Sequence, residues 1–241
     1  MLRAMLRHSL RCAFTPSVLV VVIAAAGACA ATPPPHGHRE HHAEDHHPGT
    51  VHHSFADAER WSREFDAVDR DGWQKPDEVV SLMAITAGQT VVDLGAGTGY
   101  FLARLSKAAG PSGKVIGLDI EPNMVDHMAK RASRDGLMNV EARRVALDGS
   151  DLPQGVDRFL IVDTWHHIDA RGAYAKKLAA ALKPGGAVIV VDFTRDAPKG
   201  PPAKHRLSPE SVMAELAAGG FESRLAEESL PHQYVVVAKK R

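Results

Sequence analysis

The chain has 241 residues, which suffices for one well-buried domain with appendages, since single domains mostly run to roughly 100–200 residues. Its 29 basic side chains balance its 29 acidic ones, so the formal net charge is zero. This balance lacks the positive excess expected of a nucleic-acid-binding surface and favours a small or weakly charged partner.

Residues 1–29 have the order of a secretory leader, with basic, apolar and then small residues. The apolar run over 18–26 is shorter than the roughly 20 residues of a comfortable membrane span. Residues 26–29 resemble a bacterial lipoprotein signal ending at Cys29, while simple cleavage and an uncleaved anchor stay open. We therefore expect a periplasmic protein or one attached through its N-terminus to the periplasmic side of a membrane, and a cytoplasmic one if the leader is not used.

Residues 30–54 are rich in histidine and proline, and eight of the fourteen histidines lie between His36 and His53. Nothing in this composition builds a core, so we expect a solvated linker. The alternative is a weak scavenging tail for zinc, copper or nickel, because clustered imidazoles are good ligands for these metals.

The folded domain is predicted to cover residues 55–241 and to begin with helices over 56–65 and 75–85. Pro76 suits a first helical turn, and the acidic residues that follow it complement the helix dipole.

Beyond Gln89 the apolar patterns alternate between strand and helix, which predicts an α/β domain. Residues 183–186 predict a turn that ends one helix and precedes the next strand, and Ser208 predicts a helix cap. The expected strands cover 90–94, 114–119, 140–145, 158–163, 187–192, 221–226 and 233–238, and the expected helices cover 100–109, 122–135, 170–182 and 209–218.

The first of these strands runs into a glycine-rich turn, Asp93-Leu94-Gly95-Ala96-Gly97-Thr98-Gly99. A dinucleotide fingerprint needs its third glycine one residue later, where this chain has Tyr100. The carboxylate of Asp93 would repel a pyrophosphate but attract a ligand that carries an ammonium and a sulfonium. The turn therefore predicts a ligand that is cationic at this end.

The second strand ends in Asp119, at the same edge of the sheet as the turn. The two oxygens of its carboxylate can accept hydrogen bonds from both hydroxyls of a ribose. An adenosine with a cationic tail satisfies both acids, and S-adenosylmethionine has this chemistry.

With 91–101 as a glycine motif and 118–124 as an acidic motif, residues 61–237 resemble the class I S-adenosylmethionine-dependent methyltransferases, in particular type 11-like domains in an exported bacterial member. The resemblance implies a Rossmann-like, doubly wound, seven-stranded sheet whose last strand is antiparallel, preceded by short helices. It also implies the following cofactor-binding residues: Asp93, Gly95, Ala96 and Gly97 for the methionine part, Asp119 for ribose, Ile120 for adenine, and Asp148 and Asp163 in the loops after strands three and four. For Asp148, in the loop over 146–153, an ordinary solvated acid is the alternative.

The loop over 163–169 follows the fourth strand, at the edge where a methyl acceptor would arrive. His166 or His167 is a candidate catalytic base, because imidazole titrates near neutrality. The alternative is that one of them caps the next helix while the other packs.

The three tryptophans, Trp61, Trp73 and Trp165, are candidates for the walls of an apolar acceptor pocket, with core packing as the alternative. Arg206 follows the fifth strand and is expected to meet an anionic acceptor or to pair with a surface acid.

The sequence thus favours an enzyme that transfers a methyl group from S-adenosylmethionine to a small-molecule or lipid-like acceptor. We expect no nucleic-acid substrate, because the charge is balanced and the fourth strand is not followed by Asn-Pro-Pro-Tyr. The alternative is an exported, non-catalytic protein that uses the same fold to bind a ligand or a metal.

Overall fold

The computed structural model describes residues 57–241. The predicted leader over 1–29 and the predicted linker over 30–54 therefore lie outside the described residues. Among the helices within 57–241, none has the length and apolar character needed to cross a membrane.

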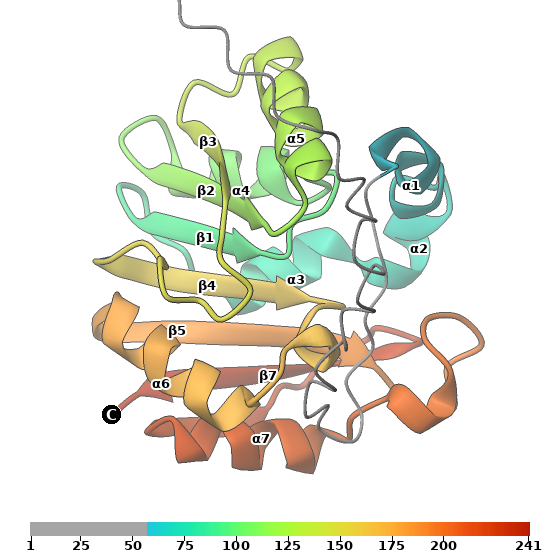
Figure 1. The fold of residues 1–241 in the computed structure, drawn as a ribbon, viewed down its shortest axis with the longest axis vertical. Coiled ribbons are helices and arrows are strands. Elements are labelled where there is room, and N and C mark those ends of the chain that lie inside the picture. Colours follow the sequence, from blue (N-terminus) through green and yellow to red (C-terminus); the bar gives the residue numbers. More distant parts are fainter. Residues whose placement is uncertain (1–56) are drawn as a thin grey trace, which may run out of the picture. The chain divides into compact units, whose positions relative to one another are not determined.

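Seven strands form one sheet in the order β3-β2-β1-β4-β5-β7-β6 (Figure 1). Neighbouring strands from β3 to β5 pair in parallel, whereas β7 runs antiparallel to both β5 and β6. The strands are β1 Thr90–Leu94, β2 Lys114–Asp119, β3 Val140–Arg144, β4 Val156–Val162, β5 Leu182–Phe193, β6 Phe221–Leu225 and β7 Gln233–Lys240. The predicted fold, including the antiparallel last strand, is confirmed.

Helices cover both faces of the sheet, and each face has its own apolar cluster. Phe159, Leu178 and Leu216 belong to the cluster that joins the sheet to α6 (Arg171–Ala181) and α7 (Pro209–Ala218). A second cluster joins the opposite face to α3 (Pro76–Leu82), α4 (Leu102–Ala109) and α5 (Pro122–Arg134). Because both faces are covered, the central strands are nearly continuous runs of Val, Ile and Leu.

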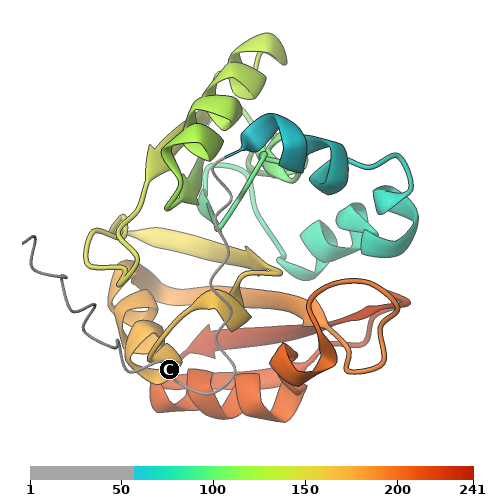
Figure 2. The same ribbon diagram turned by 45° about the vertical axis from the view of Figure 1, so that its right-hand side comes forward.

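Two short helices, α1 (Ala58–Phe65) and α2 (Arg70–Gln74), precede α3. They flank the same ends of the parallel strands as the loop that follows β5, as Figure 2 shows. The sequence patterns predicted one helix before residue 75 and missed α2, because a five-residue helix that contains Gly72 has no apolar periodicity to detect.

The turn predicted at residues 183–186 lies inside β5. Leu182 already pairs with Val156, and after a shift of register Ala187 pairs with Arg158, so the exposed residues between them form an irregularity of the strand. The prediction that the helix ends before this segment is correct, since α6 ends at Ala181. The predicted cap at Ser208 is also confirmed, because its side chain accepts a hydrogen bond from the Ser211 N–H.

The order of the strands reverses between β1 and β4. In open α/β sheets, ligands bind at this switch point, beyond the carboxyl ends of the strands.

Candidate active site

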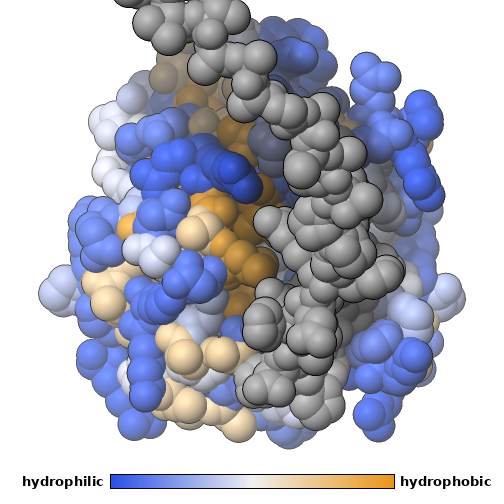
Figure 3. Space-filling model, in the orientation of Figure 1, coloured by the Kyte–Doolittle hydropathy of each residue, from blue (hydrophilic) through white to orange (hydrophobic). Residues whose placement is uncertain are grey.

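A cavity of about 560 Å³ lies at these carboxyl ends, within the range of roughly 300–1,000 Å³ typical of ligand pockets. Its lining comes from α1 and α2, from the glycine turn, from the segments after β2, β3 and β4, and from the loop after β5. Apolar side chains gather in a hollow near the centre of the face drawn in Figure 3.

The glycine turn is held between the ends of β2 and β4. The N–H groups of Gly95 and Ala96 donate to the carbonyl oxygen of Leu118 at 2.8 and 2.9 Å. On the other side, the Thr164 hydroxyl contacts the carbonyl oxygen of Gly95 at 3.3 Å. Gly95 has a φ of 73°, and a Cβ placed there would lie 2.3 Å from Thr164 Oγ1. The turn therefore requires glycine at this position both for its backbone conformation and for lack of space.

We expect Gly95→Ala to lower the free energy of unfolding by about 2–4 kcal/mol, because it adds a steric clash to an unfavourable φ. Gly185→Ala is the matched control, since Gly185 has a φ of 75° and nothing lies within 4 Å of its added Cβ. Gly185→Ala should lower the free energy of unfolding by only about 1 kcal/mol. Urea unfolding of both variants measures the difference, and equal losses would contradict the role of the Thr164 contact.

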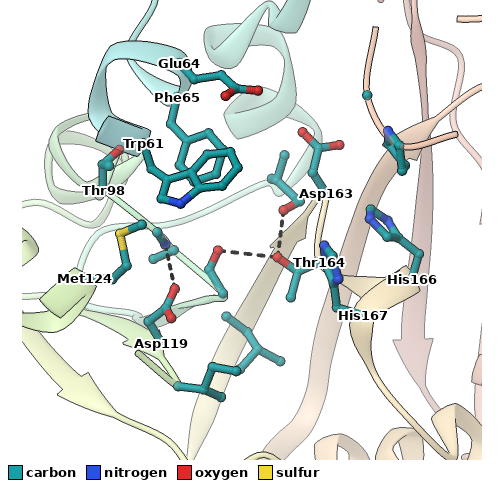
Figure 4. Close-up of a pocket in the computed structure, with 18 of the residues that line it drawn as sticks. Trp61, Glu64, Phe65, Thr98, Asp119, Met124, Asp163, Thr164, His166 and His167 are labelled. Carbon is teal, nitrogen blue, oxygen red and sulfur yellow. Dashed lines mark hydrogen bonds between the residues drawn. The ribbon is translucent and has the colours of Figure 1, made fainter. Parts of the chain in front are cut away.

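Asp119 connects the turn to β2 and lies at the wall of the cavity (Figure 4). One carboxylate oxygen accepts the Gly97 N–H at 2.9 Å and the other accepts the Glu121 N–H at 3.0 Å. Burial raises the pKa of Asp119, and the two backbone donors partly offset this effect. Each oxygen keeps a further lone pair for a ligand hydroxyl. The neighbouring Ile120, predicted to pack on adenine, also lines the cavity and is 39% exposed.

Asp93 lies behind the turn and does not line the cavity, whereas the predicted ligand-binding residues Gly95, Ala96 and Gly97 do. Burial raises the pKa of the Asp93 carboxyl to about 7, against the opposing effect of the Arg70 guanidinium. Direct contact of Asp93 with a ligand stays a prediction, and the structure favours an electrostatic effect through the turn.

Asp148, the first choice for an adenine contact, is placed elsewhere. Its carboxylate accepts hydrogen bonds from the Ser150 N–H at 3.0 Å and from Lys177 Nζ at 3.0 Å. The Ser150 side chain, Lys177 and the Ser150 N–H together lower the pKa of Asp148 to about 2. Ala146 and Leu147 line the cavity, and Asp148 does not. The structure contradicts the predicted contact and fits the alternative, a solvated loop acid, because Lys177 on α6 draws the carboxylate away from the cavity.

The loop after β4 brings Asp163, His166 and His167 to the cavity together. Asp163 is partly buried, and desolvation raises the pKa of its carboxyl to about 7 with a further contribution from Asp192. Gln233 Nε2 donates to Asp163 Oδ1 at 2.6 Å.

The two histidine rings lie 4.2 Å apart between centroids. His166 Nδ1 is 2.9 and 3.0 Å from the two carboxylate oxygens of Asp192. Neither histidine caps α6, whose N-cap residue is Ala170 without a side-chain hydrogen bond to the helix. The alternative of a capping histidine is therefore wrong.

Aromatic side chains of the N-terminal helices wall one side of the cavity. Trp61 stacks on Phe65 with ring centroids 5.3 Å apart, and Trp73 stacks on Phe193 at 6.0 Å. Trp61 and Trp73 thus occupy the pocket wall, as the sequence suggested. Trp165 is fully buried in the core and donates its Nε1–H to Glu215, so the prediction of a pocket wall is wrong for this residue.

Arg206 organises the loop after β5 instead of meeting an acceptor or a surface acid. Its guanidinium donates to five backbone carbonyl oxygens, those of Thr194, Arg195, Ala197, Lys199 and Pro201. Both sequence interpretations of Arg206 are corrected, because the loop turns its own carbonyl groups toward this side chain. Lys199 of the same loop pairs with Asp69 at 3.1 Å and lines the cavity.

Residues 91–186 match the family of the methyltransferase domain. The demethylmenaquinone methyltransferase of Oceanobacillus iheyensis is 30% identical over 126 residues, which cover 51% of each chain. The ubiquinone/menaquinone biosynthesis C-methyltransferase UbiE of Salmonella arizonae is 28% identical over 118 residues, or 48% of this chain and 47% of that one. The chain thus spans about half the length of the curated relatives it matches.

Among solved structures, a SAM-dependent methyltransferase from Aquifex aeolicus aligns with a TM-score of 0.71 and 27% identity, covering 76% of this chain and 98% of that one. A possible exported protein from Bordetella parapertussis aligns with a TM-score of 0.57 and 19% identity over 81% and 76% of the two chains, which shows a shared fold. Together with the strand order, these similarities show that residues 91–186 match a methyltransferase domain and that the chain shares the fold of S-adenosylmethionine-dependent methyltransferases.

Proposed function

We propose that the protein transfers a methyl group from S-adenosylmethionine to a small-molecule or lipid-like acceptor. The observation that carries this proposal is one cavity with two unlike sides. The glycine turn and Asp119 lie on one side together with Trp61 and Phe65, and the histidine loop lies on the other (Figure 4).

The residues on the first side fit the cofactor. Asp119 has lone pairs left for ribose hydroxyls, and Ile120 offers an apolar surface beside it. At the turn, the buried Thr98 hydroxyl makes no hydrogen bond within the described residues, so a polar ligand group would satisfy it. Ala96 and Gly97 line the cavity with small residues, so a ligand can approach the backbone of the turn closely.

The cofactor supplies a methyl group on a positively charged sulfur. The protein has to hold the acceptor in line with that group and to exclude water from it. Trp61, Phe65 and Trp73 provide flat apolar walls suited to this task. The names of the curated relatives refer to quinones and quinone biosynthesis, which supports an apolar small-molecule acceptor. Export through the predicted leader remains a separate proposal that rests on residues 1–29 alone.

Calorimetric titration of the purified protein with S-adenosylmethionine tests the cofactor. Incubation of the protein with methyl-labelled S-adenosylmethionine and fractionated cell extract tests the transfer. We expect saturable binding and label in low-molecular-mass products that mass spectrometry can identify. An absence of binding at millimolar cofactor would overturn the proposal. Binding without transfer to any fraction would support the non-catalytic alternative, and label only in macromolecules would contradict a small acceptor.

A further inference from the structure

A histidine–carboxylate pair is buried in the acceptor-side wall of the cavity. His166 is 2% exposed and Asp192 is fully buried, with contacts of 2.9 and 3.0 Å from Nδ1 to the two carboxylate oxygens. Asp192 Oδ1 also accepts the Phe193 N–H at 2.8 Å, which fixes the carboxylate on β5.

This contact determines which nitrogen of His166 carries the proton. An ionised carboxylate only accepts hydrogen bonds, so Nδ1 of the neutral ring is the donor and Nε2 keeps its lone pair. His166 lines the cavity (Figure 4). Asp192 contacts Nδ1 of the ring, so Nε2 is the nitrogen that it does not engage. Among the described residues, the pair therefore presents a hydrogen-bond acceptor and base to whatever fills the acceptor side.

The charges around His166 come from its own loop, from β5 and from α6. Burial lowers the pKa of His166, but Asp192 on β5 and Asp163 in the loop after β4 raise it further than burial lowers it. Arg171 on α6 opposes them, and the ring of His167 lies alongside. The balance leaves the pKa of His166 above its ordinary value, which makes it a stronger base than a free imidazole.

We propose that His166 is the general base of the methyl transfer, that Asp192 is its positioning residue, and that the acceptor is a hydroxylated aromatic ring or an enol methylated at oxygen. This inference rests on the proposed function and extends it to the acceptor. A carboxylate acceptor is ionised at neutral pH and needs no base, whereas a phenolic hydroxyl with a pKa near 10, like that of tyrosine, does. The stacked aromatic walls suit a planar ring.

The acceptor hydroxyl gives its proton to Nε2 of His166 while its oxygen forms a bond to the methyl carbon. The bond from that carbon to sulfur breaks, and the electron pair stays on sulfur, which becomes neutral. Asp192 stabilises the imidazolium that forms, as a carboxylate beside Nδ1–H does in other histidine bases.

The first test uses the protein without cofactor. In the full chain labelled with ¹⁵N-histidine, NMR titration is expected to show the Nδ1–H tautomer for His166, assigned with His166→Gln. In Asp192→Asn the pKa of His166 should fall by at least about one unit, because the charge is lost while an acceptor oxygen remains. The signals of His127 on α5, outside the cavity lining, serve as the internal control. An Nε2–H tautomer in the wild-type protein, or an unmoved pKa in the variant, would overturn the pairing.

The second test measures methyl transfer from labelled S-adenosylmethionine into cell extract. His166→Gln should lower incorporation at least about 100-fold and leave the cofactor affinity within about two-fold. His127→Gln is the matched control and should keep the wild-type incorporation and the wild-type cofactor affinity. Equal incorporation by His166→Gln, or a product methylated at nitrogen or carbon, would overturn the inference. A wild-type protein that binds no cofactor would instead contradict the proposed function, so the two failures are distinguishable.

Discussion

Replacement of Asp119 by Ala is expected to weaken binding of S-adenosylmethionine at least about 100-fold. The variant removes the acceptor of the Gly97 and Glu121 N–H groups and the two oxygens available to ribose. A hydrogen bond to a charged group contributes about 1.5–3 kcal/mol, so the loss of two such bonds to ribose amounts to at least about 3 kcal/mol. Calorimetric titration of both proteins measures this difference.

A loss of affinity could also come from a distorted turn, because Asp119 holds the Gly97 N–H. Adenosine and 2′-deoxyadenosine separate these causes, since they differ only in one ribose hydroxyl. The wild-type protein should prefer adenosine, and Asp119→Asn should lose most of that preference even where both ligands bind more weakly. A preference that survives in Asp119→Asn would show that another group reads the ribose.

The part of the site carried by β1 and β2 was predictable because it depends on local sequence. Two apolar strands that end in Asp93 and Asp119 must meet at one edge of a parallel sheet, and the positive φ of Gly95 and Gly97 follows from the turn between strand and helix. The same local logic predicted the seven strands and the cap at Ser208.

The acceptor side was less predictable because its contacts join residues far apart in the chain. Asp192 lies in a run of apolar strand residues, and only the pairing of β5 with its neighbours brings it to His166. Gln233 is similar, since it reaches Asp163 across 70 positions. A buried polar residue inside an apolar strand pattern is a usable signal, but the sequence does not identify its partner.

The predictions for side chains in loops were wrong for a different reason. Asp148 and Arg206 were assigned to ligands because their charges suit such roles, yet both are satisfied inside the protein. A loop between strand and helix has its own backbone groups to satisfy, and a long side chain such as that of Arg206 reaches several of them at once. Charge and position alone therefore overestimate ligand contacts in loops.

Binding of S-adenosylmethionine is expected to release protons near pH 7 and to strengthen as pH rises from about 6 to 8. Burial raises the pKa of Asp93 to about 7, so its carboxyl is roughly half protonated there. A cation bound at the turn favours the ionised form, and the proton that leaves makes binding tighter at higher pH. Calorimetry in buffers of different ionisation enthalpy counts these protons. S-adenosylhomocysteine, which lacks the sulfonium charge, should show a smaller effect.

Asp93→Asn should reduce the protein's share of this proton release and weaken cofactor binding at pH 8 by about 10-fold or more, since one pKa unit corresponds to about 1.4 kcal/mol. The same variant should be more stable than the wild type without cofactor at pH 8. A carboxyl with a raised pKa stabilises the fold fully below its unfolded pKa, near 4, and that contribution is lost as pH rises through about 7. Asparagine does not ionise, so the variant does not lose this stability as pH rises. A variant that binds the cofactor as tightly as the wild type at pH 8 would show that Asp93 serves the fold and not the ligand. Weaker binding with higher stability would show that the buried charge is retained for the cation.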